Sequence, residues 1–179
     1  MVLLVGEVRL QVLFELRGAI KEVIKLDRFC RLIPQVGTNL VYAVDGASDV
    51  SDIATISGRI ISCMGKPFLC GDVVFGGSNF VASVILEAMK ISPGLRSAIN
   101  LRGDDVIAQA LRDMGMDFVV LSSMDVQDVC PVTIEIKESG EVHRAYYHPG
   151  AFGVEASTTI LGEIPMEIVA IVTELLEPV

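Results

Sequence analysis

Short apolar segments alternate with amphipathic segments along nearly the whole chain, and this alternation constrains the fold more than any single motif. The apolar segments are typical of buried strands and cover residues 37–44, 58–64, 68–75, 96–101 and 117–122. Apolar residues at helical spacing predict helices over about 8–25, 78–90 and 104–114, with a last helix that begins at Pro165. Residues 129–148 alternate on both sides of a Glu-Ser-Gly turn, which predicts a β-hairpin. This order predicts an α/β protein, a three-layer α/β/α domain on a mixed sheet.

The 179 residues are enough for one domain with a sizeable core. No repeat, low-complexity tract or linker interrupts the alternation. We therefore expect an N-terminal helical segment over residues 1–30 and one compact α/β unit over 31–179.

Apolar residues make up 51% of the chain, and the mean hydropathy is +0.57. No apolar run reaches the roughly eighteen residues that a membrane helix requires. The excess indicates buried strands or a subunit interface, so we expect a homo-oligomer that does not bind membranes. The first residues lack the basic start of a signal peptide, which favours a cytoplasmic protein.

The net charge of −9 argues against direct binding of nucleic acid, which depends on many Lys and Arg side chains. A small anion remains compatible, because it needs only one local cluster of donors. The four cysteines are scattered and the chain has only two histidines, so the sequence predicts no metal site.

A glycine-rich turn joins a predicted strand to a predicted helix at Gly76, Gly77 and Ser78. In such a turn the first N–H groups of the helix point at an open space and carry partial positive charge, which suits a phosphate. Ser78 is also a natural N-cap for the helix. A turn that merely fits between strand and helix explains the pattern equally well.

Arg59 stands at the start of one predicted strand and Arg102 at the end of another. Arginine binds phosphate in a bidentate manner, so either side chain is a candidate anion ligand. The alternative is an ion pair with a neighbouring carboxylate, such as Asp104 or Glu155.

Four aspartates could approach Mg²⁺ together with a diphosphate, although helix capping accounts for each of them as well: Asp49, Asp52, Asp104 and Asp105. His148 precedes Pro149 and Gly150 in a predicted loop, which is a place where functional side chains occur. His143 is expected to be an ordinary strand residue. No Ser-His-Asp or Cys-His arrangement follows from the spacing.

Together the segments resemble the archaeal-type thiamine-phosphate synthase (ThiN) domain, which occurs fused to hydroxymethylpyrimidine kinase or to helix-turn-helix regulators. The matching pieces are collinear and spread over nearly the whole chain: RLIPQVGTNLVYAV (31–44), DVSDIATISGRI (49–60), FGGSNFVASVILEAMK (75–90), RSAINLR (96–102) and HPGAFGVEASTTILG (148–162).

The resemblance implies an aldolase-type α/β/α fold and a site for thiamine phosphate or its phosphorylated pyrimidine and thiazole precursors. In the family, hydroxymethylpyrimidine diphosphate is joined to a thiazole phosphate and pyrophosphate leaves. Arg59 matches the family's Gly-Arg-Ile arginine and would be the catalytic residue of an active enzyme. The implied ligand-binding residues are Asn39, Arg59, Gly76, Gly77, Ser78, Arg102 and Glu155, with Mg²⁺ a candidate companion of a diphosphate.

The chain departs from the family directly after the glycine turn. The synthases read Ser-Arg-His there, whereas this chain reads Ser78-Asn79-Phe80. Phe80 cannot transfer a proton, and Asn79 carries no charge. We therefore place a non-catalytic or weakly active ligand-binding module first, an active synthase second, and a purely structural assembly partner third.

Overall fold

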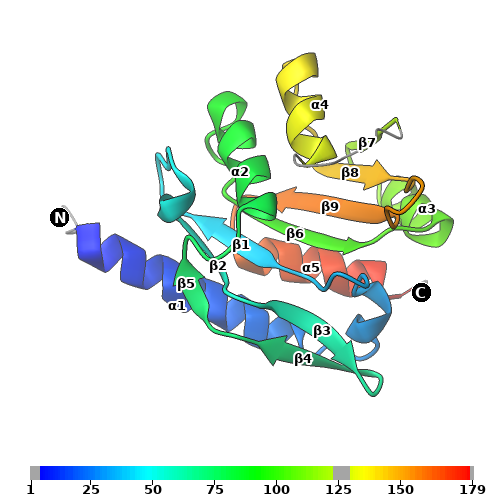
Figure 1. Ribbon diagram of the computed structural model, residues 1–179, viewed down its shortest axis with the longest axis horizontal. Helices are drawn as coiled ribbons and strands as arrows, with labels where there is room; N and C mark the ends of the chain where they lie inside the picture. Colours follow the sequence, from blue (N-terminus) through cyan, green and yellow to red (C-terminus); the bar gives the residue numbers. More distant parts are fainter. Residues whose placement is uncertain (1–4, 123–129, 178–179) are drawn as a thin grey trace.

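A seven-stranded sheet lies between two layers of helices in the structure, a computed structural model that describes residues 5–122 and 130–177 (Figure 1). The strands follow the order β5 (Val73–Phe75), β2 (Ile53–Ile56), β1 (Leu40–Ala43), β6 (Ser97–Arg102), β9 (Ser157–Gly162), β8 (Ala145–His148) and β7 (Phe118–Val120). Strands β7 and β8 pair in parallel and the other neighbours are antiparallel. The predicted three-layer α/β/α fold on a mixed sheet is confirmed.

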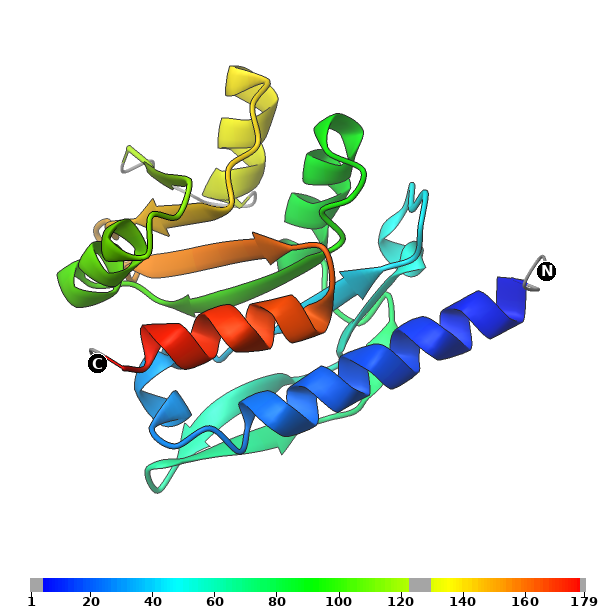
Figure 2. The ribbon, with the colours of Figure 1, turned by 180° about the vertical axis from the view of Figure 1, so that it is seen from behind.

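Each face of the sheet has its own hydrophobic core because side chains alternate along the strands. Leu40 and Tyr42 of β1 pack with α1 (Val5–Val23), α3 (Asp105–Asp113) and α5 (Pro165–Leu175). Val41 and Ala43 face the opposite side, which is covered by α2 (Phe80–Ile91) and α4 (Pro131–Ser139). Figure 2 shows α1 and α5 running side by side across the first of these faces.

Three smaller elements complete the described chain. The 3₁₀ turns η1 (Phe29–Leu32) and η2 (Val50–Asp52) flank the strand β1. A hairpin of β3 (Arg59–Cys63) and β4 (Lys66–Cys70) forms a separate two-stranded sheet beside the main one. The segment 68–75, predicted as one strand, therefore divides into β4 and β5.

The predicted hairpin at 129–148 is wrong. Residues 131–139 form the helix α4, and only residues 145–148 form a strand. Two helix signals were present in the sequence, because Pro131 occupies the first turn and Gly140 follows the helix with a φ of 68°. Strands β2 and β9 were not predicted, although both lie inside the sheet.

Helix α1 packs through Leu16, Ile20 and Val23 into the same core as β1 and α5. The N-terminal helical segment expected over residues 1–30 thus shares its core with the following unit. In the described ranges, no helix combines the length and the apolar character that crossing a membrane requires.

Candidate functional site

The glycine-rich turn leads from β5 into α2, but its capping differs from the prediction. Helix α2 begins at Phe80, and Asn79 occupies the N-cap position without a side-chain capping bond. Ser78 is not the cap, because its Oγ accepts a hydrogen bond from Arg59 Nη1 at 3.1 Å. Neither side chain therefore caps the positive end of the α2 dipole.

Gly77 lets this turn lie directly against β2. A Cβ atom at Gly77 would lie 2.8 Å from both Thr55 Oγ1 and Val74 Cγ2, which is closer than real Cβ contacts. Its neighbour Gly76 has a φ of 70°, in the left-handed region that favours glycine. Glycine is therefore needed at position 77 because a side chain would clash there, and it is favoured at position 76 because of the backbone conformation.

Arg59 is the cation of this site. Its side chain starts at the first position of β3 and reaches Ser78 beside the start of α2. Desolvation by burial lowers the pKa of Arg59, and no carboxylate of the described residues opposes that effect. The guanidinium is thus bonded to a hydroxyl group and not to a carboxylate of the described chain. It can therefore bind an anion.

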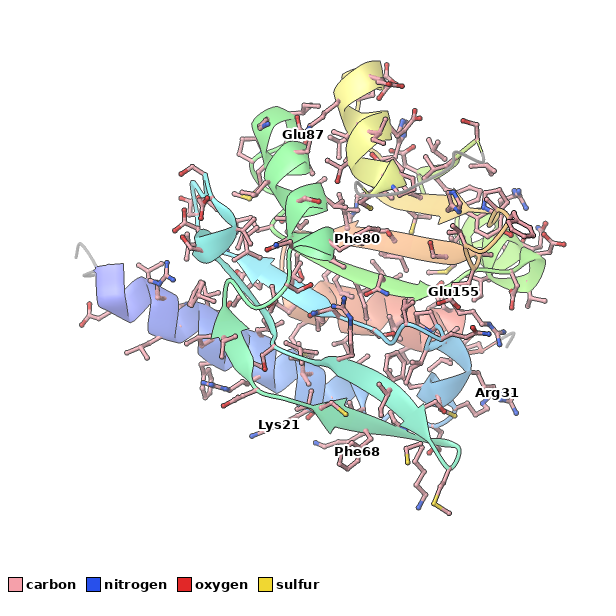
Figure 3. All side chains as sticks on the ribbon, in the orientation of Figure 1. Lys21, Arg31, Phe68, Phe80, Glu87 and Glu155 are labelled. Carbon is pink, nitrogen blue, oxygen red and sulfur yellow. The ribbon has the colours of Figure 1, made fainter. Side chains whose placement is uncertain are left out.

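Arg59 and Phe80 separate two concave regions. The first, here called the main pocket, has a volume of about 350 Å³ and extends from Arg59 to Glu155 and His148. The second, here called the side hollow, is more open and is lined by the turn itself, including Gly77, Ser78 and Asn79. Figure 3 shows Phe80 at the foot of α2, with Glu155 on the loop across the sheet.

The walls of the main pocket are mostly apolar. Its polar groups are Arg59, Asn100, His148, Glu155, Ser157 and Thr159, and its apolar side chains include Val36, Phe80, Val81, Val132 and Val154. A volume of this size with few polar groups is typical of a site for a small organic ligand.

The first residues of α2 and of α4 meet at the main pocket. Val81 of α2 and Pro131 and Val132 of α4 line it, and the two helices stand side by side on the sheet (Figure 1). The hydroxyls of Ser83 and Thr133 hydrogen-bond at 3.1 Å and tie the two first turns together. Two helix N-termini and Arg59 thus contribute positive potential to the pocket.

Glu155 supports the wall of the main pocket. One carboxylate oxygen accepts from the N–H of Gln35 at 2.9 Å and the other from the N–H of Val36 at 3.0 Å. Glu155 therefore holds the 34–36 segment in place, and its carboxylate accepts these two hydrogen bonds instead of pairing with Arg59.

Asn39, a predicted site residue, lies in neither concave region. It is fully buried, and its amide accepts from the N–H of Ile56 and donates to the C=O of Ile56, both at 3.0 Å. Asn100, which sequence reasoning missed, lines the main pocket and joins Asn39 to Gly37. The only sequence signal was its place two residues before Arg102 in the matching segment RSAINLR (96–102).

Arg102 also lies outside both regions. It forms an ion pair with Asp104 at 2.6 Å, which is the alternative that the sequence left open. The structure therefore places Arg59 with Gly77 and Ser78 in the side hollow and with Glu155 in the main pocket, and it leaves Gly76, Asn39 and Arg102 outside both regions.

Three of the four candidate magnesium aspartates have other partners. Asp49 caps η2, and Asp52 pairs with Arg9 at 3.3 Å. Asp104 caps α3 as well as binding Arg102. Within residues 5–122 and 130–177, no group of three or more His, Cys, Asp or Glu is placed to hold a metal ion. Arg59 and the helix termini remain the groups that could face the oxygens of a diphosphate with its Mg²⁺.

His148 lies at the end of β8 rather than in a loop, and its side chain faces the main pocket. The residue is 3% exposed, and burial lowers the pKa of its imidazole. The ring is therefore neutral at pH 7.

Comparison with known proteins gives a consistent result. The family model described as "Thiamine-phosphate synthase ThiN" matches residues 15–174. The "Thiamine-phosphate synthase ThiN" of Methanothermobacter thermautotrophicus is 30% identical over 173 residues, with 89% of this chain and 90% of the relative covered. The "Bifunctional thiamine biosynthesis protein ThiDN" of Methanocaldococcus jannaschii is 31% identical over 147 residues. That match covers 77% of this chain and 34% of the relative, so the chain spans about a third of it.

Solved structures agree with these relatives. The C-terminal domain of a phosphomethylpyrimidine kinase superposes with a TM-score of 0.82 at 28% identity, over 93% of this chain and 99% of that domain. The l-fuculose-1-phosphate aldolase of Thermus thermophilus superposes with a TM-score of 0.55 at 13% identity, over 92% of this chain and 91% of that one. The second likeness concerns the fold alone, and it confirms the expected aldolase-type architecture.

Proposed function

Because this chain belongs to the thiamine-phosphate synthase ThiN family, we propose that it binds thiamine phosphate or its phosphorylated pyrimidine and thiazole precursors in the main pocket, with little or no synthase activity. The phosphate end of the ligand lies at Arg59 and the start of α2, which both line this pocket. The ring lies between the apolar walls that Val81, Val132 and Val154 provide.

The observation that carries the proposal is the pairing of Arg59 with Ser78 at a helix start that neither Ser78 nor Asn79 caps. A half-buried guanidinium without a carboxylate partner in the described chain is costly for the folded protein unless it has a ligand to bind. Arginine and helix N–H groups together form a site for phosphate oxygens.

The proposal of little or no synthase activity rests on Phe80. Departure of pyrophosphate needs positive charge and N–H donors, which Arg59 and α2 supply. Phe80 lies where the family's synthases have a histidine, 48% exposed and between the two concave regions. A phenyl ring moves no proton, so any step that needs an acid or a base at this position is lost.

Thermal melts test the proposal directly. The unfolding temperature is measured with thiamine phosphate, thiamine diphosphate, hydroxymethylpyrimidine phosphate and thiazole phosphate, each with and without Mg²⁺. A ligand that binds only the folded state stabilises it by about 2.7 kcal/mol at a hundredfold excess over Kd. We expect a shift with at least one of them, and no shift with any would contradict the proposal.

A matched pair of variants locates the site. Arg59→Ala should weaken binding by about 10- to 100-fold, since a hydrogen bond to a charged group is lost. Arg112→Ala removes the same charge from a residue that lines neither concave region and lies over the Phe118 ring. It should leave the affinity unchanged.

An active synthase is the second candidate function, and the similarity to a named synthase over 89% of the chain favours it. The two candidates separate in one assay. Incubation with hydroxymethylpyrimidine diphosphate and thiazole phosphate releases pyrophosphate if the chain is a synthase. We expect that the wild-type chain releases no pyrophosphate above the uncatalysed rate and that Phe80→His releases it measurably.

A further inference from the structure

The outer face of helix α1 exposes apolar side chains. The helix buries its other side in the core and runs along a margin of the molecule, where its first turns extend past the strands (Figure 1, Figure 2). On the side away from the core, Leu10 is 68% exposed and Phe14 is 79% exposed. The two residues are four positions apart, so they are neighbours on the helix surface. They form an apolar patch that the described chain leaves uncovered.

Gly18 lies one turn after Phe14 on the same face. Glycine in a helix interior is less stable than alanine. Nothing lies within 4 Å of the position that a Cβ atom at Gly18 would occupy, so packing within this chain does not require glycine. Its φ is not positive, so the backbone conformation does not require glycine either. What the glycine does provide is room for a side chain of a neighbouring helix.

The outer face carries opposite charges at its two ends. Glu7 lies seven residues before Phe14 and Lys21 lies seven residues after it, and both are exposed. Figure 3 shows Lys21 at the margin of the molecule, away from the sheet. Glu7 also has an interaction within its own chain, but a carboxylate has about four lone-pair sites and can accept from a second donor. A face with an acid at one end, a base at the other and an apolar centre complements an antiparallel copy of itself.

We propose that α1 pairs with α1 of a second copy of this chain, antiparallel and about a two-fold axis at Phe14. The Phe14 rings of the two copies then meet, and Leu10 lies at the level of the partner's Gly18. Glu7 lies at the level of the partner's Lys21, and every contact occurs twice, as in any two-fold interface. A parallel pair would instead place like charges together. Helix α1 lines neither concave region, so the pairing is independent of the proposed function.

The β5 edge of the main sheet is a less suitable surface for a second copy, because α1 of the same chain already covers it. Arg17 Nη2 donates to the C=O of Val73 at 3.0 Å. Arg9 Cζ lies 3.7 Å from the centre of the Phe75 ring. These contacts protect the edge from pairing with another strand.

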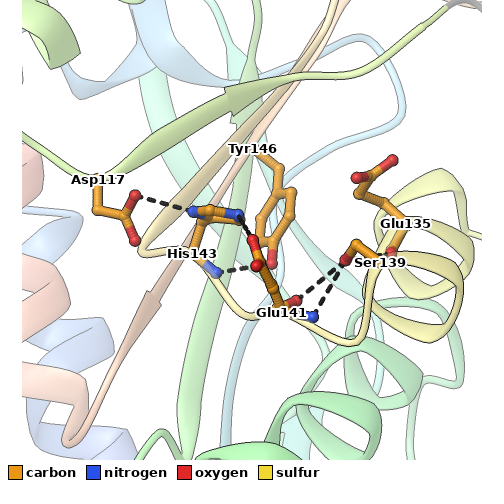
Figure 4. Close-up of polar contacts among 6 residues, drawn as sticks. All are labelled: Asp117, Glu135, Ser139, Glu141, His143 and Tyr146. Atoms are coloured by element: carbon orange, nitrogen blue, oxygen red, sulfur yellow. Dashed lines mark hydrogen bonds and ion pairs between the residues drawn. The ribbon is translucent and has the colours of Figure 1, made fainter.

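The opposite edge, β7, is protected by its length and by charge. It has three residues, and a polar cluster lies at its start. His143 Nδ1 lies 2.8 Å from Asp117, its Nε2 lies 3.7 Å from Glu141, and its backbone N–H donates to Tyr146 Oη at 2.8 Å (Figure 4). Short edge strands beside charged side chains resist pairing. Val120, which is 50% exposed, is an apolar residue of this edge.

The hairpin of β3 and β4 also exposes apolar side chains, including Met64 and Phe68. Its residues 59–70 contain Arg59 and Lys66 but no carboxylate. Two copies of the hairpin would therefore meet with like charges, which is unfavourable. Among these surfaces, the outer face of α1 is the best complement of a second copy.

Analytical ultracentrifugation of the full chain over an about hundredfold range of concentration tests the pairing. We expect the wild type to sediment as a dimer that dissociates on dilution. Phe14→Glu should weaken dimerisation at least about 30-fold, the effect of losing an aromatic contact at the centre of an interface. Val120→Lys at the β7 edge and Phe68→Glu on the hairpin are matched controls, because each replaces an exposed apolar residue by a charged one. Both should dimerise as the wild type does.

Gly18→Gln separates dimerisation from folding. Glutamine is a better helix former than glycine, so the melting temperature at the lowest concentration should be unchanged or higher. In the dimer the new side chain occupies the space that faces the partner, and association should weaken by about tenfold or more. A residue that served only the fold of the monomer would not show these opposite effects.

A carbodiimide cross-link between Glu7 and Lys21 tests the orientation. The two residues are about 21 Å apart along one helix, so a direct amide bond between their side chains can join only two different chains. We expect mass spectrometry to find this cross-link in the wild-type dimer and not in Phe14→Glu. A dimer without the cross-link would overturn the antiparallel arrangement.

Other results would overturn the pairing itself. The wild type would remain a monomer at every concentration, or Phe14→Glu and Gly18→Gln would both dimerise as the wild type does. Loss of the dimer in Val120→Lys or Phe68→Glu alone would place the interface at the β7 edge or at the hairpin. A monomeric wild type that sediments with phospholipid vesicles would show that a membrane covers this face instead.

Discussion

Arg59 Nη1 donates to Ser78 Oγ at 3.1 Å, across nineteen residues of sequence. This bond joins the first residue of β3 to the turn before α2, and it sets the guanidinium at the helix start. The relationship links the hairpin, the glycine turn and the main pocket in one site.

Replacement of Arg59 should separate function from stability. In Arg59→Met the apolar stem is kept and the half-buried charge is removed, so we expect the free energy of unfolding to be unchanged or slightly higher while pyrophosphate binding is lost. Urea unfolding with and without pyrophosphate measures both quantities. Arg59→Lys keeps the charge and should retain part of the binding. A loss of more than about 1 kcal/mol of stability in Arg59→Met would show that the arginine is structural instead.

Gly77→Ala should destabilise the protein by about 1–3 kcal/mol, because its Cβ would lie 2.8 Å from Thr55 Oγ1 and Val74 Cγ2 and force the turn to move. Gly94→Ala is the control, since nothing lies within 4 Å of the place that its methyl group would occupy. That variant should be neutral or slightly more stable. Thermal unfolding compares them, and equal effects of the two substitutions would contradict the close approach at Gly77.

Asn39→Leu should cost about 3 kcal/mol of stability, because it leaves the N–H and the C=O of Ile56 unpaired in the core. The folded fraction should still bind ligand with wild-type affinity, since Asn39 lines neither concave region. Asn79→Ala removes an amide that makes no capping bond and should leave the stability nearly unchanged. Urea unfolding and calorimetry give the two measurements. A variant with full stability and weakened binding would place Asn39 in the site after all.

His148 should make the stability depend on pH. Burial holds the pKa of the His148 imidazole in the folded protein below its ordinary value of 6.5. As the pH falls, the imidazole of the unfolded chain therefore takes up a proton first. The stability is complete above about pH 6.5 and declines as the pH falls through the folded pKa. Urea unfolding between about pH 8 and 5 should show this decline in the wild type and a smaller one in His148→Gln. Identical pH profiles would mean that the imidazole is not desolvated.

Several helices could be predicted from the sequence because the residues that indicate each helix lie within a few positions of one another. The apolar periodicity of α1, α2 and α3 and the Pro165 that opens α5 were readable directly. The segment at 131–139 was wrongly predicted to be a strand because its apolar residues Val132, Ile134 and Ile136 alternate along the chain as they do in a strand. Its helix buries Val132 and Ile136, four residues apart, on the sheet side beside α2.

The sequence by itself determined the family, the layered α/β order and the glycine turn with its arginine, because these depend on residue types in a linear order. Tertiary structure alone decided which candidates meet. Arg102 has Asp104 two residues away and needs no ligand, whereas Arg59 reaches a hydroxyl nineteen residues further on. The buried amide of Asn39 and the orphaned Nε2 of His148 likewise follow only from packing, since a hydrogen-bond partner is defined by distance in space and not by separation along the chain.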